Sequence, residues 1–237
     1  MPTFLLVRHG ENDLIKQGRM GGRLPGVHLN EAGRTQAQST ARMIAQLKAQ
    51  ADERMKAHKP TRKKAVPQDK PQPEKPPEPP VWKLYSSPME RAMETAEPIA
   101  QALDLEIVVR PGLLETHCGD WAGKTVKSLR RRKIWREVQN NPSQFRFPGG
   151  ETFVECQERM VAEMEFLRTQ HVAHDIVICV SHADPLKLLV AHYLGLPFDN
   201  FQRLSIDPAS ITILYLDDSG SRLLALNIAP SFFFAGP

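Results

Sequence analysis

The 237-residue chain has few cysteines, and their pattern excludes several protein classes. Only three are present, and they form neither a CxxC pair nor a zinc-ligand pattern: Cys118, Cys156 and Cys179. An odd, widely spaced set predicts reduced thiols and a cytoplasmic location. No apolar run approaches the 18 residues of a membrane span, and the N-terminus lacks the features of a signal peptide. We therefore expect a soluble protein with no membrane partner.

The net positive charge of the chain is confined to one stretch of the sequence. Residues 54–80 hold eight of the twenty prolines and eight Lys/Arg against three acidic residues, a net charge of +5, whereas the whole chain carries +4. The charge therefore indicates no nucleic-acid-binding fold and no nucleic-acid partner. A segment so poor in apolar residues cannot bury enough surface to offset its ordering entropy. We predict a flexible Lys/Pro-rich insertion at about 50–80 in a single domain spanning 1–237.

Apolar runs and helical patterns alternate along the rest of the chain. Runs typical of buried strands occupy residues 3–7, 81–85, 105–109, 175–180, 211–216 and 223–226. Helical spacing follows Asn30 and recurs over residues 87–103, 124–139, 151–170 and 184–194. The alternation predicts an α/β fold, a three-layer α/β/α sandwich with a mostly parallel central sheet.

Three polar residues are predicted to begin helices. Asn30 and Asp184 are suitable N-caps for the helices that follow them. Ser87 is followed by a proline and, three residues on, by Glu90, which is the pattern of a capping box.

Charged side chains recur where predicted strands end or helices begin. Arg8 and His9 follow the first strand, Arg91 lies one turn into a helix, Glu115 follows two leucines, and His182 follows the strand that ends at residue 180. Ligands of open α/β sheets bind beyond the carboxyl ends of the strands. Two arginines, two histidines and a carboxylate there supply the nucleophile, positive charge and proton donor that phosphoryl transfer needs.

Five motifs in one order resemble the histidine phosphatase superfamily, whose best-known members are the cofactor-dependent phosphoglycerate mutases. They are residues 6–11 (LVRHGE), 86–95 (SSPMERAMET), 114–123 (LETHCGDWAG), 148–151 (PGGE) and 180–182 (VSH). The resemblance covers roughly residues 3–227 without the Lys/Pro insertion. It implies the phosphoglycerate mutase-like version of the α/β/α fold.

The resemblance also implies a role for each candidate residue. His9 accepts the phosphoryl group, and its oxygens are held by Arg8, Arg91 and His182. Glu115 protonates the leaving oxygen, so we expect its pKa to be raised. Asp120 and Glu151 are nearby carboxylate rivals for this role. The implied chemistry uses no metal, because arginine and histidine stabilise the charge.

Residues around these motifs are expected to contact the substrate, with some departures from the family pattern. Asn12 stands where the family often has Ser or Thr, and Ala183 with Asp184 replaces the usual Gly-Gly. The further substrate-binding candidates are Asn12, Gly21, Gly22, Ala183 and Arg130. The run of four basic residues that begins at Arg130 is either a solvated helix face or a contact for an anionic part of the substrate.

The sequence favours hydrolysis of a small phosphorylated metabolite and leaves alternatives open. Only about 25 residues separate Gly123 from the PGGE motif, and this spacing resembles the smaller phosphatases of the family. A phosphomutase is the main alternative, and only then is 2,3-bisphosphoglycerate expected as a cofactor. A non-catalytic phosphate-binding protein is the second alternative. The phenylalanines at 232–234 are expected to pack back on the domain, and a homodimer formed through them is the less favoured interpretation.

Overall fold

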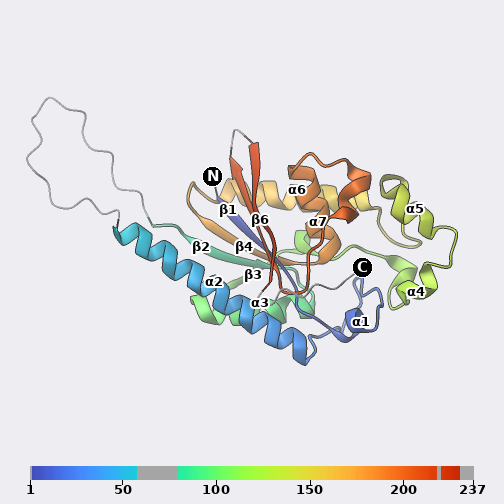
Figure 1. The fold of residues 1–237 in the computed structure, drawn as a ribbon, viewed down its shortest axis with the longest axis horizontal. Helices are drawn as coiled ribbons and strands as arrows, with labels where there is room; N and C mark the ends of the chain where they lie inside the picture. The colour runs from blue at the N-terminus through green and yellow to red at the C-terminus, as the bar shows by residue number, and fades with distance from the viewer. Residues whose placement is uncertain (1, 58–78, 218–219, 230–237) are drawn as a thin grey trace, which may run out of the picture.

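The computed structural model describes residues 2–57, 79–217 and 220–229. Its six-stranded sheet has the order β3-β2-β4-β1-β5-β6 and confirms the predicted α/β class (Figure 1). The strands are β1 (Thr3–Arg8), β2 (Trp82–Ser86), β3 (Ile107–Val109), β4 (Ile176–Ser181), β5 (Ile211–Asp217) and β6 (Gly220–Ile228). The first four in the order pair in parallel, while β5 and β6 are antiparallel to their neighbours.

Helices connect the strands and cover both faces of the sheet. The α-helices are α1 (Asp13–Lys16), α2 (Glu31–Ala57), α3 (Glu90–Leu103), α4 (Val126–Leu129), α5 (Trp135–Asn140), α6 (Phe153–Gln170) and α7 (Ala183–Tyr193). The short 3-10 helices are η1 (Pro111–Leu113), η2 (Gly119–Trp121), η3 (Pro142–Gln144) and η4 (Phe198–Arg203). None of the described helices combines the length and apolarity needed to cross a bilayer.

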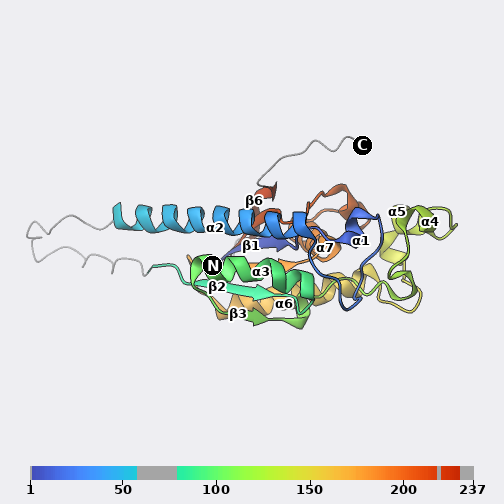
Figure 2. The same ribbon diagram turned by 90° about the horizontal axis from the view of Figure 1, so that it is seen from below.

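Alternating side chains of the buried strands build two separate core layers. On β1, Phe4 and Leu6 pack with α6 and α7, whereas Leu5 and Val7 pack with α2 and α3. This alternation is the reason that the strand reads as a continuous apolar run. The long α2 runs along one side of the sheet and extends past it (Figure 2).

Two predictions about helix extent are wrong. The expected insertion at 50–80 begins too early, because α2 continues to Ala57; residues 58–78 lie outside the described residues. The single helix expected over 124–139 is two short helices, α4 and α5, separated by turns. Its basic run falls in that break, where exposed like charges gain nothing from a continuous helix.

The sheet brings three strand ends to one edge. Arg8 at the end of β1 pairs with Ser181 at the end of β4, and Ser86 at the end of β2 lies opposite Val180. The residues that follow these strands are therefore neighbours, although they are far apart in the sequence. This edge carries the candidate site.

Candidate active site

His9 follows β1 directly, and its contacts determine which ring nitrogen carries the proton. Its Nδ1 lies 2.7 Å from the carbonyl oxygen of Gly10. A carbonyl oxygen only accepts, so Nδ1 donates and Nε2 bears the lone pair. Arg91 donates its Nε–H to this Nε2 at 3.2 Å. Burial, followed by the charges of Arg91 and Arg8, holds the pKa of His9 well below its usual value, so the ring is neutral.

Two guanidinium groups lie at the same edge as His9. Arg91 is 1% exposed and donates to the carbonyl of Gly22 at 2.8 Å, and Arg8 donates to that of Ile206 at 2.6 Å. Arg91 Nη1 and Arg8 Nε are buried without a hydrogen-bond partner among the described residues. Buried donors without an acceptor are costly. Both groups are therefore suited to receive the oxygens of an anion.

His182 follows β4, the second strand that supplies the site, and it is fully buried. Its ring centroid lies 5.1 Å from that of His9, with the planes at 63°. Its Nδ1 has no hydrogen-bond partner among the described residues and lies 3.7 Å from Glu115 Oε2. Burial and the nearby positive charges lower the pKa of His182 well below its usual value.

Ser87 and Asp184 are not the helix caps that the sequence predicted. Helix α3 begins at Glu90 with Met89 at the cap position and no side-chain cap bond. The Ser87 hydroxyl lies 2.8 Å from His182 Nε2 instead. His182 is itself the cap residue of α7, so Asp184 lies inside the first turn of that helix. Asn30, by contrast, caps α2 as expected, because its Oδ1 accepts from the backbone N–H of Gly33.

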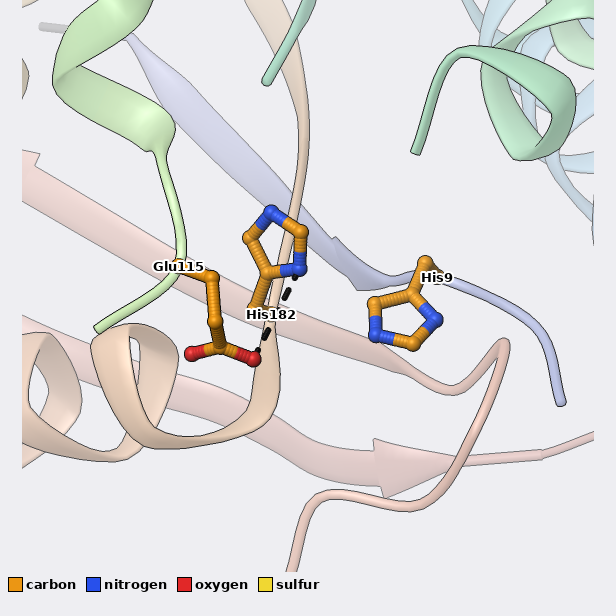
Figure 3. Close-up of side chains that lie close together, drawn as sticks. All are labelled: His9, Glu115 and His182. Atoms are coloured by element: carbon orange, nitrogen blue, oxygen red, sulfur yellow. Dashed lines mark ion pairs between the residues drawn. The ribbon is translucent and has the colours of Figure 1, made fainter. Parts of the chain in front are cut away.

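Glu115 lies in the loop between η1 and η2 and points toward the two histidines (Figure 3). Its Oε2 is 3.9 Å from Arg91 Nη2, and its Oε1 accepts from the backbone N–H of Thr116 at 2.9 Å. Burial raises the pKa of Glu115 to about 7, with Arg91 opposing and Asp184 assisting the rise. The carboxyl can therefore hold a proton near neutral pH, as predicted.

The three side chains in Figure 3 also satisfy the spacing of a metal site. Ligand atoms of His9, Glu115 and His182 all lie within 4.8 Å of one another. The guanidinium groups of Arg8 and Arg91 adjoin the same cluster, and a metal cation there meets their repulsion. The charges around the cluster therefore favour binding of an anion over binding of a metal cation.

A cavity of about 330 Å³ opens over these groups. Seven of the ten predicted site residues line it: Arg8, His9, Asn12, Gly21, Gly22, Arg91 and Glu115. Gly22 has φ +49°, and a Cβ there would lie 2.3 Å from Cys118 Sγ, so only glycine fits both the backbone and the space.

Three predicted site residues stand outside the cavity wall. His182 adjoins it through His9 and Glu115. Ala183 is the first residue of α7 and does not line the cavity. Arg130 is exposed just after α4 and borders a different hollow. This position agrees with the solvated alternative for the basic run, and a contact between Arg130 and the substrate stays a prediction.

Sequence reasoning missed most of the cavity wall beyond the phosphate end. That part is lined by Met20, Trp121, Trp135, Gln139, Lys187 and Gln202, among others. These residues come from five separate segments. Trp121 lies in the motif at 114–123, but the others belong to no motif, so only the fold brings them together.

The comparisons with known proteins agree with this geometry. The family model of the histidine phosphatase superfamily (branch 1) matches residues 4–54 and 76–229, on both sides of the Lys/Pro segment. The chain belongs to the histidine phosphatase superfamily. Its predicted family, fold and phosphatase class are thereby confirmed.

Three relatives show the range of proteins that this histidine phosphatase resembles. Phosphoserine phosphatase 1 of Hydrogenobacter thermophilus is 26% identical over 230 residues, covering 96% of this chain and 93% of its own. A probable phosphoglycerate mutase of Photorhabdus laumondii is 30% identical over 214 residues, covering 90% and 84%. A mycobacterial glucosyl-3-phosphoglycerate phosphatase, solved with VO3, has a TM-score of 0.73 and 25% identity, covering 97% of this chain and 100% of its own.

Proposed function

We propose that this histidine phosphatase hydrolyses phosphate monoesters of small metabolites through a phosphohistidine formed on His9. The observation that carries the proposal is the orientation of His9. Its neutral ring presents the Nε2 lone pair beside the guanidinium of Arg91. A nucleophile in this form needs no deprotonation before it attacks phosphorus.

The first half-reaction transfers the phosphoryl group to the enzyme. His9 Nε2 attacks phosphorus and forms a P–N bond while the ester P–O bond breaks. Arg91 moves its Nε–H from His9 to a phosphoryl oxygen, and Arg8 neutralises the developing charge. Glu115, protonated because its pKa is raised to about 7, gives its proton to the leaving alcohol oxygen.

The second half-reaction returns the enzyme to its starting form. The Glu115 carboxylate takes a proton from a water molecule, whose oxygen attacks phosphorus. The P–N bond breaks, His9 Nε2 recovers its lone pair, and phosphate leaves. In the tautomer whose Nε2 accepts a hydrogen bond from the Ser87 hydroxyl, 2.8 Å away, the His182 ring carries its proton on Nδ1. In this form His182 can donate a hydrogen bond from Nδ1 to the phosphoryl group in both steps.

A phosphomutase is the competing function, and the 30% identical probable mutase supports it. A mutase must exclude water and hold a second phosphate. Arg130, which begins the basic run that could contact an anionic part of the substrate, is exposed and lies outside the cavity. The phosphatase names of two relatives also favour hydrolysis, and phosphoserine and glucosyl-3-phosphoglycerate are the first substrates to assay.

We further propose that catalysis needs no metal and takes place in the cytoplasm. Arg8 and Arg91 supply the charge that a metal would supply elsewhere. The three cysteines are free and buried, as suits a reducing compartment. Undiminished turnover after dialysis against EDTA would support the first point; loss of turnover that zinc or magnesium restores would overturn it. The homodimer stays a prediction.

The function is tested with p-nitrophenyl phosphate between pH 5 and pH 8. Wild-type protein should release phosphate, and His9→Ala should not. Equal turnover by both proteins contradicts the phosphohistidine route. Isomerisation of 3-phosphoglycerate in the presence of 2,3-bisphosphoglycerate, without free phosphate, would favour the mutase.

A further inference from the structure

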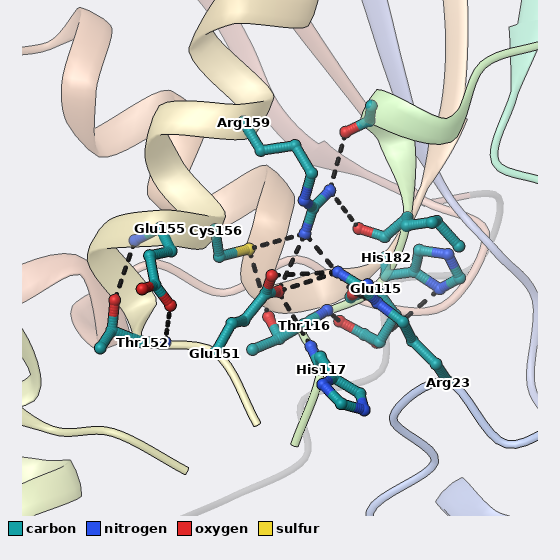
Figure 4. Close-up of polar contacts among 12 residues, drawn as sticks. Arg23, Glu115, Thr116, His117, Glu151, Thr152, Glu155, Cys156, Arg159 and His182 are labelled. Carbon is teal, nitrogen blue, oxygen red and sulfur yellow. Dashed lines mark hydrogen bonds and ion pairs between the residues drawn. The ribbon is translucent and has the colours of Figure 1, made fainter. Parts of the chain in front are cut away.

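Glu151 was a rival for the acid role, yet the structure gives it other partners. It is the glutamate of the PGGE motif and lies between two arginines (Figure 4). Arg23 Nη2 donates to both of its carboxylate oxygens at 3.1 and 3.0 Å, and Arg159 Nη2 donates to Oε1 at 3.0 Å. The backbone N–H of His117 also donates to Oε1, at 2.9 Å. These four bonds place the Glu151 carboxylate among donors of the two arginines and the loop, and it does not line the cavity.

The two arginines also hold the backbone of the loop that carries Glu115. Arg23 Nε donates to the carbonyl of Glu115 itself at 2.7 Å. Arg159 Nη1 donates to the carbonyls of Gly112 at 2.8 Å and Leu114 at 2.9 Å. Glu151 thus orients two guanidinium groups whose remaining donors bind two carbonyl groups of this loop and one of η1, directly before it.

The glycine before Glu151 allows the motif to approach the loop closely. A Cβ on Gly150 would lie 2.1 Å from the carbonyl oxygen of His117. The backbone N–H of Glu151 donates to that same oxygen at 2.9 Å. The motif and the Glu115 loop are therefore joined through both backbone and side chain.

The Glu115 carboxyl has few contacts of its own to fix its position. Among the described residues its carboxyl accepts a hydrogen bond from the adjacent Thr116 N–H, and the loop from Leu114 to Cys118 has no regular secondary structure. The direction of the Glu115 side chain therefore depends on where the loop backbone is held. Displacing a catalytic group by about 1 Å can cost on the order of 100-fold in rate.

We propose that Glu151 is a positioning residue for proton transfer, acting through Arg23 and Arg159 to hold Glu115 against the leaving oxygen. The proposal rests on the proposed function, in which Glu115 protonates that oxygen. It assigns the PGGE motif to the acid step rather than to phosphate binding, because Glu151 does not line the cavity.

The dependence on the leaving group separates a positioning role from a structural one. An alkyl alkoxide needs the proton from Glu115, whereas p-nitrophenolate leaves well without it. Misplacing Glu115 should therefore lower kcat/KM for an alkyl phosphate and spare that for p-nitrophenyl phosphate. General loss of folded enzyme lowers both equally. The constant kcat/KM is used because it reports the first half-reaction, before the second use of Glu115.

The main variant is Glu151→Gln, which keeps the size but removes the charge and one acceptor oxygen. We expect kcat/KM for phosphoserine or β-glycerophosphate to fall roughly 10- to 100-fold, and that for p-nitrophenyl phosphate to change less than about threefold. Glu155→Gln is the matched control. Glu155 also pairs with an arginine, Arg146, and accepts a hydrogen bond from a backbone N–H. Its bonds among the described residues are to Arg146 and Thr152 and not to the Glu115 loop, so both constants should stay near wild type.

A double variant tests whether Glu151 acts through Glu115. The Glu115→Gln variant has already lost kcat/KM for the alkyl phosphate selectively. Adding Glu151→Gln to it should therefore change this constant little further. Additive losses, or equal losses for both substrates, overturn the proposal. If Glu151→Gln does not fold, Arg23→Gln replaces it with the same expected selectivity. Failure of the proposed function is distinct, because wild-type protein would then not turn over p-nitrophenyl phosphate.

Discussion

The strand ends and the Glu115 loop supply the candidate site in different ways. His9, Ser87 and His182 each follow a strand of the parallel half of the sheet, so the sheet ladder fixes their backbone. Glu115 lies outside the sheet, where Arg23, Arg159 and Glu151 hold its loop. The sheet therefore fixes the positions of the nucleophile and the anion pocket, whereas a polar network fixes the position of the acid. Phosphoryl binding and proton donation should be separable by mutation.

The largest effect is expected at the first strand end. His9→Ala removes the lone pair that attacks phosphorus, and with it the covalent route for every substrate. Turnover of both p-nitrophenyl and alkyl phosphates should fall to background, measured as phosphate release. Retention of wild-type turnover for either substrate would show that His9 is not the nucleophile.

Arg91→Gln should have the next largest effect. Loss of one preorganised charge at the transition state costs about 3–4 kcal/mol, or roughly 100- to 1,000-fold in kcat. The loss should be similar for aryl and alkyl substrates, because Arg91 serves the phosphoryl group. Arg110→Gln is the control, since Arg110 pairs with Glu163 away from the cavity. A loss confined to alkyl substrates would instead place Arg91 with the acid.

Glu115→Gln should lower kcat/KM only for substrates with poor leaving groups, because this constant reports the first half-reaction. The raised pKa of about 7 means that wild-type kcat/KM for an alkyl phosphate falls as pH rises through 7. His9 is neutral across this range because its pKa is lowered, so it adds no limb near neutrality. The variant should be slow with alkyl phosphates and show no such fall. An unchanged alkaline limb in Glu115→Gln would assign that limb to another group.

The smallest effect concerns stability rather than activity. The folded-state pKa of Glu115 is raised from 4.5 to about 7, so the native state keeps a proton that the unfolded state has lost. Wild-type stability should therefore decrease relative to Glu115→Gln as pH rises from 4.5 to 7, by up to about 3 kcal/mol. Urea unfolding of both proteins at pH 5 and pH 8 measures the difference. A constant difference would mean that the carboxyl titrates alike in both states.

The sheet and the strand-end residues could be predicted because their signals are local. Phe4, Leu6 and Val7 form an apolar run that requires burial on both faces, and His9 follows it directly. The position of a strand end predicts convergence at one edge without any knowledge of distant contacts. Arg91 and Glu115 lie at no strand end, and the motifs at 86–95 and 114–123 associated them with the histidines instead.

The errors arose where a distant partner decides the local structure. Ser87 resembled a helix cap, but its hydroxyl bonds to His182, which is 95 residues away in sequence. Glu151 stood beside Glu115 as a rival acid, because the sequence shows neither of its arginine partners. The helix expected over 124–139 breaks after Leu129. No sequence pattern encodes these long-range pairings, because either partner alone is compatible with a solvated position.

The most direct test of the account traps the enzyme during turnover. Wild-type protein is mixed with a phosphate monoester, quenched in alkali within milliseconds to seconds, and digested for mass spectrometry. The account predicts an acid-labile, alkali-stable phosphoryl group on the peptide that contains His9, and none in His9→Ala. A phosphoryl group on His182 or another residue, or turnover without any labelled peptide, would contradict it.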